Sequence, residues 1–203
     1  MQNESDPEVM PPKPRGRPPK VRRIFWVMGA LALGGVFVLG LQVRRSMNIS
    51  RHHPRIQGQV MQIKTAIGNY QTDYNSFPVS PGATETPIPT DATNPLVTIL
   101  MGIPVGDLNP KEIRTLDAPI GMNNRGGLID AGDGKWSLYD SWGNPYRVIM
   151  DIDYDNVIPN PDVKNSDPKI RSEAPPELPT QVMVYSAGPD GVFLTKDDIV
   201  SWR

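Results

Sequence analysis

The chain has 203 residues, no cysteine and 23 prolines, and its formal net charge at neutral pH is −1. Without cysteine, no disulfide can stabilise the fold and no thiol can act as a nucleophile. Residues 1–45 carry eight basic and three acidic side chains, whereas residues 46–203 carry thirteen and nineteen. This uneven distribution excludes a protein that binds nucleic acid along its whole length.

Residues 1–23 are polar, basic and rich in proline, which predicts a disordered tail. The tail contains an AT-hook pattern, in which Arg15, Gly16, Arg17 and Pro18 would lie in a narrow A·T minor groove. The alternative is a polybasic segment that is attracted to anionic lipid and sets the membrane topology. We favour the second interpretation, because so short a match in a tail rich in proline and arginine is unspecific. DNA binding through residues 14–20 stays the alternative function.

Residues 24–43 contain no charged side chain. A helix of this length is about 30 Å long, which is enough to cross the hydrocarbon core of a bilayer. The run is longer than the apolar part of a signal peptide and is followed by Arg44 and Arg45, so we expect an uncleaved anchor. More basic residues precede the anchor than follow it closely. The sequence therefore predicts a single-pass inner-membrane protein with a cytoplasmic N-terminus and a periplasmic domain at 44–203.

After the anchor, residues 56–77 carry a helical stripe of apolar side chains. The apolar positions alternate in steps of four and three, and they are Ile56, Val60, Ile63, Ile67, Tyr70 and Tyr74. Polar side chains are expected on the opposite face, at Gln57, Gln59, Gln62, Lys64, Asn69 and Asp73. The stripe covers fewer than three heptads and lacks an opposed charge pattern. It therefore favours a helix that packs on a sheet over a coiled coil.

The remaining chain divides into a variable region, 78–138, and a C-terminal region, 139–203. In the variable region we expect a short helix at 96–103, with Asn94 as its N-cap and Pro95 at its first position, and mostly loop at 105–135. The C-terminal region has strand patterns at 146–154 and 181–185, a polar loop at 156–179 and a final loop at 186–203. A long helix followed by a small antiparallel sheet predicts an α+β fold.

Three stretches resemble the type II secretion major pseudopilin and its type IV pilin-like relatives. The first, Ala66 to Pro78, is similar to the end of the family's first helix, which closes on an aromatic-proline pair. The second is Tyr139-Asp-Ser-Trp-Gly-Asn-Pro-Tyr146, where serine replaces the family's proline. The third is Val184-Tyr-Ser-Ala-Gly-Pro-Asp-Gly191 followed by Asp197-Asp-Ile-Val-Ser-Trp202.

The resemblance implies a pilin-like domain and a structural role in a secretion or pilus-type envelope machine. Its partners would be the inner membrane and other pilin-like or secretion-system subunits, with no small-molecule substrate. One departure is clear, because the anchor begins Arg23-Ile-Phe-Trp-Val27 and lacks the family's Gly-Phe cleavage junction and membrane glutamate. We therefore expect a divergent relative without the prepilin processing signal.

The same resemblance implies calcium in the C-terminal loop. The expected ligands are the carboxylates of Asp190, Asp197 and Asp198 and backbone carbonyls near Ala187 and Leu194. The residue types agree in kind, since calcium binds oxygen ligands and Gly188 and Gly191 would let the backbone turn. The alternative is an Asp-Gly turn with solvated acids.

No catalytic pattern is visible in the sequence, and we expect no enzyme. It has no phosphate-binding glycine loop and no nucleophile elbow, and its two histidines are adjacent, at His52 and His53. A second acidic run, 151–155, superficially follows calcium-loop spacing. Pro159 and Pro161 interrupt that spacing, so we expect a strand that continues into a polar loop.

Overall fold

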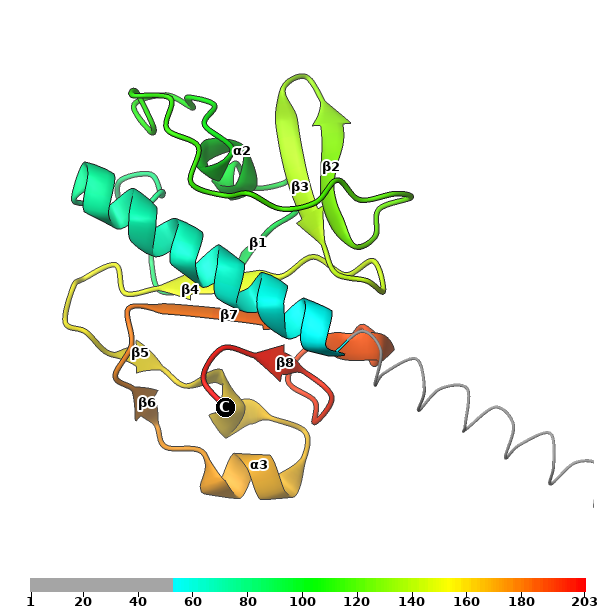
Figure 1. Ribbon diagram of the computed structural model, residues 1–203. Coiled ribbons are helices and arrows are strands. Elements are labelled where there is room, and N and C mark those ends of the chain that lie inside the picture. The colour runs from blue at the N-terminus through cyan, green and yellow to red at the C-terminus, as the bar shows by residue number, and fades with distance from the viewer. Residues whose placement is uncertain (1–52) are drawn as a thin grey trace, which may run out of the picture. The chain divides into compact units, whose positions relative to one another are not determined.

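The computed structural model describes residues 53–203. The predicted tail at 1–23, its AT-hook residues and the predicted membrane anchor at 24–43 lie outside the described residues. Within 53–203, no helix is both long enough and apolar enough to cross a membrane. The described part of the chain is an α+β fold with small antiparallel sheets, as the sequence predicts (Figure 1).

The main sheet has four antiparallel strands in the order β1-β4-β7-β8. Its strands are β1 (Ile88–Pro89), β4 (Arg147–Met150), β7 (Val182–Ser186) and β8 (Ile199–Val200). The two central strands, β4 and β7, pair over four residues, from Arg147 opposite Tyr185 to Met150 opposite Val182. β4 lies within the predicted segment 146–154, and β7 extends the predicted segment 181–185 by one residue.

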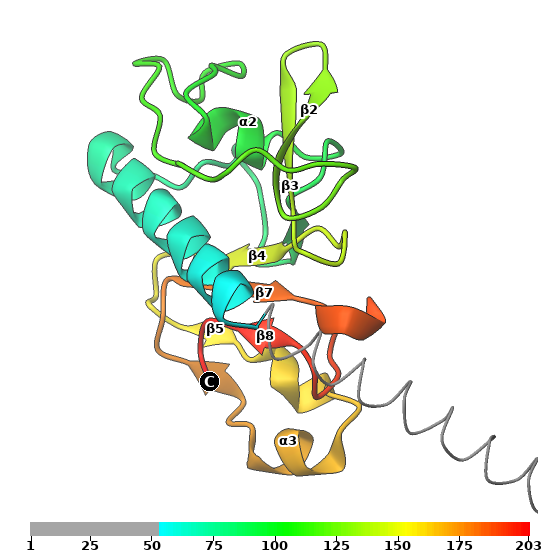
Figure 2. The same cartoon turned by 45° about the vertical axis from the view of Figure 1, so that its right-hand side comes forward.

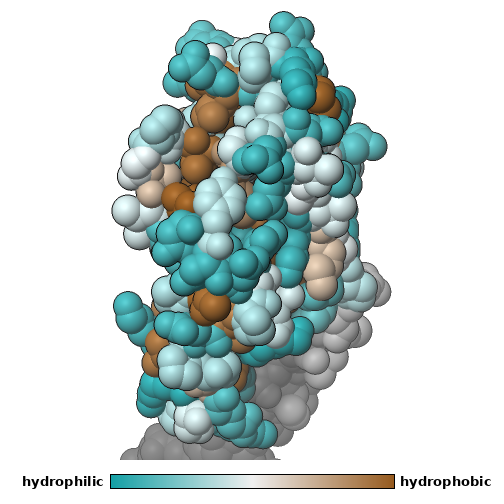
Figure 3. Space-filling model, turned by 90° about the vertical axis from the view of Figure 1, so that its left-hand side faces the viewer, coloured by the Kyte–Doolittle hydropathy of each residue, from teal (hydrophilic) through white to brown (hydrophobic). Residues whose placement is uncertain are grey.

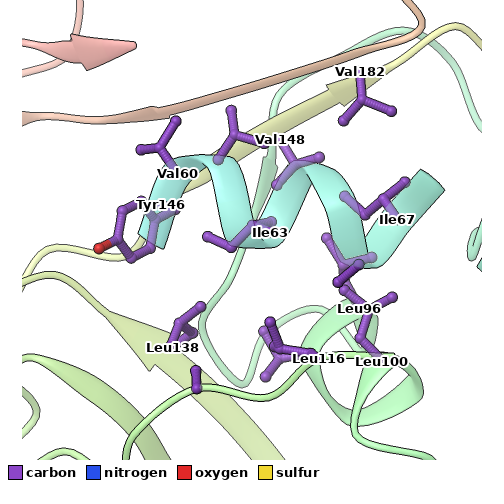
Figure 4. Packing of buried hydrophobic residues seen from close by; sticks show 14 of the residues in the cluster. Val60, Ile63, Ile67, Leu96, Leu100, Leu116, Leu138, Tyr146, Val148 and Val182 are labelled. Carbon is purple, nitrogen blue, oxygen red and sulfur yellow. The ribbon is translucent and has the colours of Figure 1, made fainter. Parts of the chain in front are cut away.

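A long helix at 53–74 lies across the sheet (Figures 1 and 2). Its apolar stripe is buried, with Ile56, Val60 and Ile67 at 0% exposure. In Figure 4 the stripe lies between Val148 and Val182 on one side and Leu96, Leu100, Leu116 and Leu138 on the other. The helix therefore joins the sheet to the variable region through one hydrophobic core, and burial of this apolar surface is the main stabilising contribution.

The helix ends at residue 74, earlier than the predicted 77. Asn75 adopts a left-handed backbone with φ of 54°, and its N–H donates to the carbonyl of Gln71 at 2.8 Å. Asparagine tolerates this conformation and commonly ends helices in this way. The chain then turns at Phe77 and Pro78, so the aromatic-proline pair closes the helix rather than extending it.

Gln59 does not lie on the polar face where the sequence places it. It is 5% exposed, and its Oε1 accepts a hydrogen bond of 2.7 Å from the hydroxyl of Tyr146. Heptad spacing puts Gln59 beside Val60 at the margin of the stripe, and the buried tyrosine hydroxyl needs a polar partner there. The helix is thereby tied to the start of β4 by a polar contact within the core.

The variable region holds more regular structure than the sequence predicts. The expected helix is shorter, α2 (Leu96–Leu100), and its N-cap is Pro95 rather than the predicted Asn94, whose side chain still accepts from the N–H of Leu96 at 2.9 Å. The expected loop at 105–135 is wrong in its last part, where β2 (Gly127–Gly132) pairs with β3 (Lys135–Tyr139) in a hairpin. Asp133 and Gly134 form its turn with positive φ, so the glycine and aspartate residues that indicate a loop belong to a hairpin connection.

The predicted loop at 156–179 also contains short elements. They are β5 (Ile158–Pro159), paired with β6 (Glu177–Leu178), the 3₁₀ turn η1 (Pro161–Lys164) and the helix α3 (Pro168–Glu173). Asn160 and Asp167 cap the two helical turns with their side chains, and a proline occupies the first position of each.

The end of the domain where the long helix finishes is hollowed. Figure 3 shows this side, where hydrophobic residues form a strip between hydrophilic ones. A hollow of about 470 Å³ is lined mostly by apolar side chains, among them Phe77, Val79, Val105, Leu108, Ile152 and Tyr154. The ring of Tyr154 stacks on that of Phe77 at 5.4 Å between centroids, which places the 151–156 turn at this distal end.

Candidate functional site

The predicted acidic residues lie in the loop that connects β7 to β8. The loop begins with the short 3₁₀ turn η2 (Gly188–Asp190), continues through a left-handed Gly191, and returns to the sheet at Ile199. β7 is buried along its whole length, so the loop starts from a fixed position. The site is therefore a surface loop held at both ends by the central sheet.

Three carboxylates converge on one hydroxyl in this loop. The Oγ1 of Thr195 lies 2.6 Å from Asp197 Oδ1, 3.2 Å from Asp190 Oδ2 and 3.3 Å from Asp198 Oδ1. A hydroxyl carries one proton and can donate to one acceptor at a time. The structure thus brings together all three predicted acids and adds Thr195, which the sequence analysis does not single out.

The negative charge of this cluster is not balanced by an ion pair. The two ion pairs that the structure shows within 53–203 are Arg114–Asp117 and Arg203–Asp162, and neither involves the cluster. Lys196, beside the site in sequence, is exposed. The donor set of carboxylates and a hydroxyl therefore has the chemistry that a hard cation such as calcium prefers.

Asp198 is the most buried of the three acids, at 8% exposure. Its Oδ2 accepts from the N–H of Leu194 at 2.8 Å. Burial raises the pKa of this carboxyl to about 6, although hydrogen bonds from Leu194 and Thr195 act in the opposite direction, and the nearby charge of Asp197 adds to the rise. Asp198 therefore holds the turn at Leu194 from a largely buried position.

At two positions of the loop, the backbone conformation is one that few residue types adopt. Gly188 has φ of 66°, and a Cβ there would lie 2.3 Å from the carbonyl oxygen of Asp197, so only glycine fits. Leu194 has φ of 65°, which is uncommon for a leucine. The hydrogen bond from its N–H to Asp198 holds it in this conformation.

The predicted backbone ligands are less clearly placed than the acids. The carbonyl of Leu194 accepts a hydrogen bond of 2.7 Å from the N–H of Ser166, so it is engaged with the 165–167 segment. Ala187 is fully buried at the start of η2. The arrangement of the three carboxylates around Thr195 is thus the stronger part of the candidate site.

Asp140, in the Tyr139–Tyr146 motif, is hydrogen-bonded to the residues from which the acidic loop starts. This carboxylate is 0% exposed. Its Oδ1 accepts three backbone N–H groups at 2.8 to 2.9 Å, from Trp142, Gly143 and Asn144, and its Oδ2 accepts the Ser186 hydroxyl at 2.6 Å. One side chain therefore fixes both the turn before β4 and the end of β7.

Asn144 continues this network into the acidic loop. Its Nδ2 donates to the carbonyl of Gly188 at 2.8 Å, and the N–H of Gly188 donates to Ser186 Oγ at 3.1 Å. The second and third family-like stretches of the sequence are thus in direct contact. The signal for this was the combination of turn residues Asp, Gly and Asn in one motif with Ser-Ala-Gly in the other, which favours side-chain to backbone hydrogen bonds.

A second acidic group lies at the distal end of the domain. One oxygen each from Glu85, Asp151 and Asp153 lie within 4.8 Å of one another, which makes this a tighter group than the three loop acids. The two oxygens of Asp151 already accept from the N–H groups of Asp155 at 3.1 Å and Asn156 at 2.9 Å. Desolvation and the neighbouring aspartates raise the pKa of Glu85. The group lies at a hydrogen-bonded turn that follows β4, so the predicted strand at 146–154 is wrong in its last part, where Tyr154 has a positive φ of 63°.

Replacing the buried carboxylate tests the Asp140 network. In Asp140→Asn one acceptor oxygen becomes an amide that faces N–H and O–H donors, so we expect the free energy of unfolding to fall by about 2–4 kcal/mol. Amide hydrogen exchange in 187–198 should also accelerate. Asp133→Asn is the matched control, since Asp133 is exposed with positive φ, and it should change stability by less than about 0.5 kcal/mol. Equal effects of the two variants would contradict the assigned role.

The raised pKa of Asp198 gives stability a defined dependence on pH in the presence of chelator. Because the folded pKa lies above the unfolded value, the folded protein binds more protons between about pH 4 and 6. The stabilising contribution is complete below pH 4 and is lost as pH rises through 6, by up to about 3 kcal/mol. Denaturant titrations at several pH values measure it. Asp198→Asn should remove this difference, and an unchanged profile in that variant would contradict the assignment.

No family model, no curated protein and no solved structure matches this chain. The function assigned below therefore depends on the motifs and the geometry of the chain itself.

Proposed function

We propose that this chain is a membrane-anchored structural subunit or accessory of a type II secretion or type IV pilus-like envelope machine. The observation that supports this most is the contact between its two C-terminal family-like motifs. Asp140 and Asn144 of one motif bind Ser186 and Gly188 of the other, where the acidic loop begins. Motifs that resemble a family in sequence thus form one structural unit, as a retained pilin-like domain requires.

The architecture supports the same proposal. A long helix follows the predicted anchor at 24–43, packs its apolar stripe on a small antiparallel sheet, and leads through a variable region to that sheet. In this proposal the N-terminus is cytoplasmic, and the domain lies in the periplasm. Its outward helix face, which includes Met61 at 45% exposure, is available to neighbouring subunits.

Calcium is part of the proposal. When bound, it would supply positive charge to the loop between β7 and β8. Asp190, Asp197 and Asp198 would provide carboxylate oxygens, and Thr195 is placed among them. The ion would act as a staple in a domain that has no disulfide, because it offsets the repulsion between three carboxylates.

Thermal unfolding of the full chain in detergent tests the calcium site. Saturating calcium should raise Tm by about 5–10 °C over chelator. Asp190→Asn and Asp197→Asn should lose most of this rise, because each removes a charged ligand. Asp133→Asn should keep it in full, and the same rise in all three variants would refute the site.

Crosslinking in membranes tests the structural role. Because the chain has no cysteine, Met61→Cys introduces a single thiol on the outward face of the long helix. A maleimide-benzophenone on this thiol inserts on irradiation into C–H bonds of whatever lies next to it, so it should yield adducts at multiples of the chain mass, or adducts with other single-span subunits that mass spectrometry identifies. A thiol on the buried face of the helix, as in Val60→Cys, should give no adduct. A chain that fractionates with membranes yet stays monomeric in both variants would contradict the subunit assignment.

A further inference from the structure

Two large apolar side chains protrude together from a short loop that leads into the β2–β3 hairpin. Ile120 is 69% exposed and Met122 is 77% exposed. Both lie in the segment 120–126, which we call the 120–126 loop. Burying this apolar surface requires something outside the described domain.

The loop is rigid. The N–H groups of Met122 and Arg125 donate to each other's carbonyls at 3.1 Å, with Asn123 and Asn124 as a two-residue turn of positive φ. A Cβ at Gly121 would lie 2.6 Å from the carbonyl oxygen of Arg125. The two apolar side chains are therefore presented by a preformed turn, and little conformational entropy is lost when they are buried.

Positive charge accompanies the apolar pair. A hollow of about 280 Å³ is lined by Ile120 and Met122 together with Arg55 and Arg125, and no acidic residue within 53–203 lines it. Both arginines are exposed. Apolar side chains beside arginine are typical of surfaces that lie at the boundary between lipid headgroups and acyl chains.

The 120–126 loop is hydrogen-bonded to the first turn of the long helix, which is the end that follows the predicted anchor in sequence. The Nη2 of Arg55 donates to the carbonyl of Gly126 at 2.7 Å, and the N–H of Gly126 donates to the carbonyl of Asp140 at 2.6 Å. Eleven residues separate Arg55 from the end of the apolar segment at Val43. Even fully extended, they span at most about 40 Å, and as a helix about 17 Å.

We infer that the 120–126 loop, with Arg55, docks on the anionic lipid surface next to the anchor. The inference rests on the proposed function, because it needs residues 24–43 to cross the bilayer. Ile120 and Met122 would enter the interface, while Arg55 and Arg125 would bind lipid phosphate. A second copy of the chain fits this surface less well, since a two-fold contact would bring the same arginines face to face.

A single thiol tests this directly in the full chain. Met122→Cys carries an environment-sensitive dye, and the chain is reconstituted in nanodiscs of phosphatidylcholine with one third phosphatidylglycerol. Tyr154→Cys is the control, because Tyr154 is 49% exposed and lies beside Phe77 at the far end of the long helix. Nitroxide-bearing lipid should quench the dye at position 122 several-fold more than the dye at position 154.

The charge dependence separates the possible outcomes. Quenching at position 122 should fall several-fold on adding Arg125→Gln, at high salt, or in pure phosphatidylcholine. If the chain inserts in the nanodiscs but the dye at position 122 is quenched only by aqueous iodide, the inference is overturned. The predicted membrane anchor, and with it the proposed function, is not contradicted by that result. Protection of position 122 by raised protein concentration in detergent would show a protein partner and also overturn it. If the chain fails to insert at all, both the inference and the proposed function fail.

Discussion

The fully buried carboxylate of Asp140 is the constraint on which the acidic loop and the turn before β4 depend. A buried charge is stable only when its hydrogen-bonding capacity is filled, and here backbone N–H groups and the Ser186 hydroxyl fill it. The side chain fixes the turn before β4 and the end of β7. The backbone carbonyl of Asp140 accepts a hydrogen bond from the N–H of Gly126. One residue thereby positions both the acidic loop and the 120–126 loop, which are far apart in sequence.

The remaining stability comes from the apolar stripe of the long helix. Because this helix contacts the sheet on one side and α2 with Leu116 and Leu138 on the other, it joins these two regions through one hydrophobic core (Figure 4). The Tyr146–Gln59 hydrogen bond lies at the junction of these two halves. Stability and site geometry are therefore coupled through the first residues of β4.

How much the sequence predicts depends on how local the information is. The stripe from Ile56 to Tyr70 and the β-branched runs in β4 and β7 carry strong periodic signals, and the α+β fold follows from them. The β2–β3 hairpin was missed because its glycines and aspartates have the same composition as a loop, and its pairing is decided by long-range packing on α2. The three loop acids were identified because the family resemblance implies calcium in this loop and their residue type suits that ion. Thr195 was not identified, because its hydroxyl comes near the three acids only when the chain folds back. The burial of Gln59 was missed because it depends on Tyr146, which is distant in sequence.

The main sheet ends on both sides in very short strands. β1 and β8 have two residues each, and one of the two in β1 is Pro89, which has no N–H to donate. Such edges offer little template for another strand, so copies of the chain concentrated on one surface would not join through sheet extension. Any ordered association is left to side-chain contacts along helices and loops, which can be reversed without unfolding the domain.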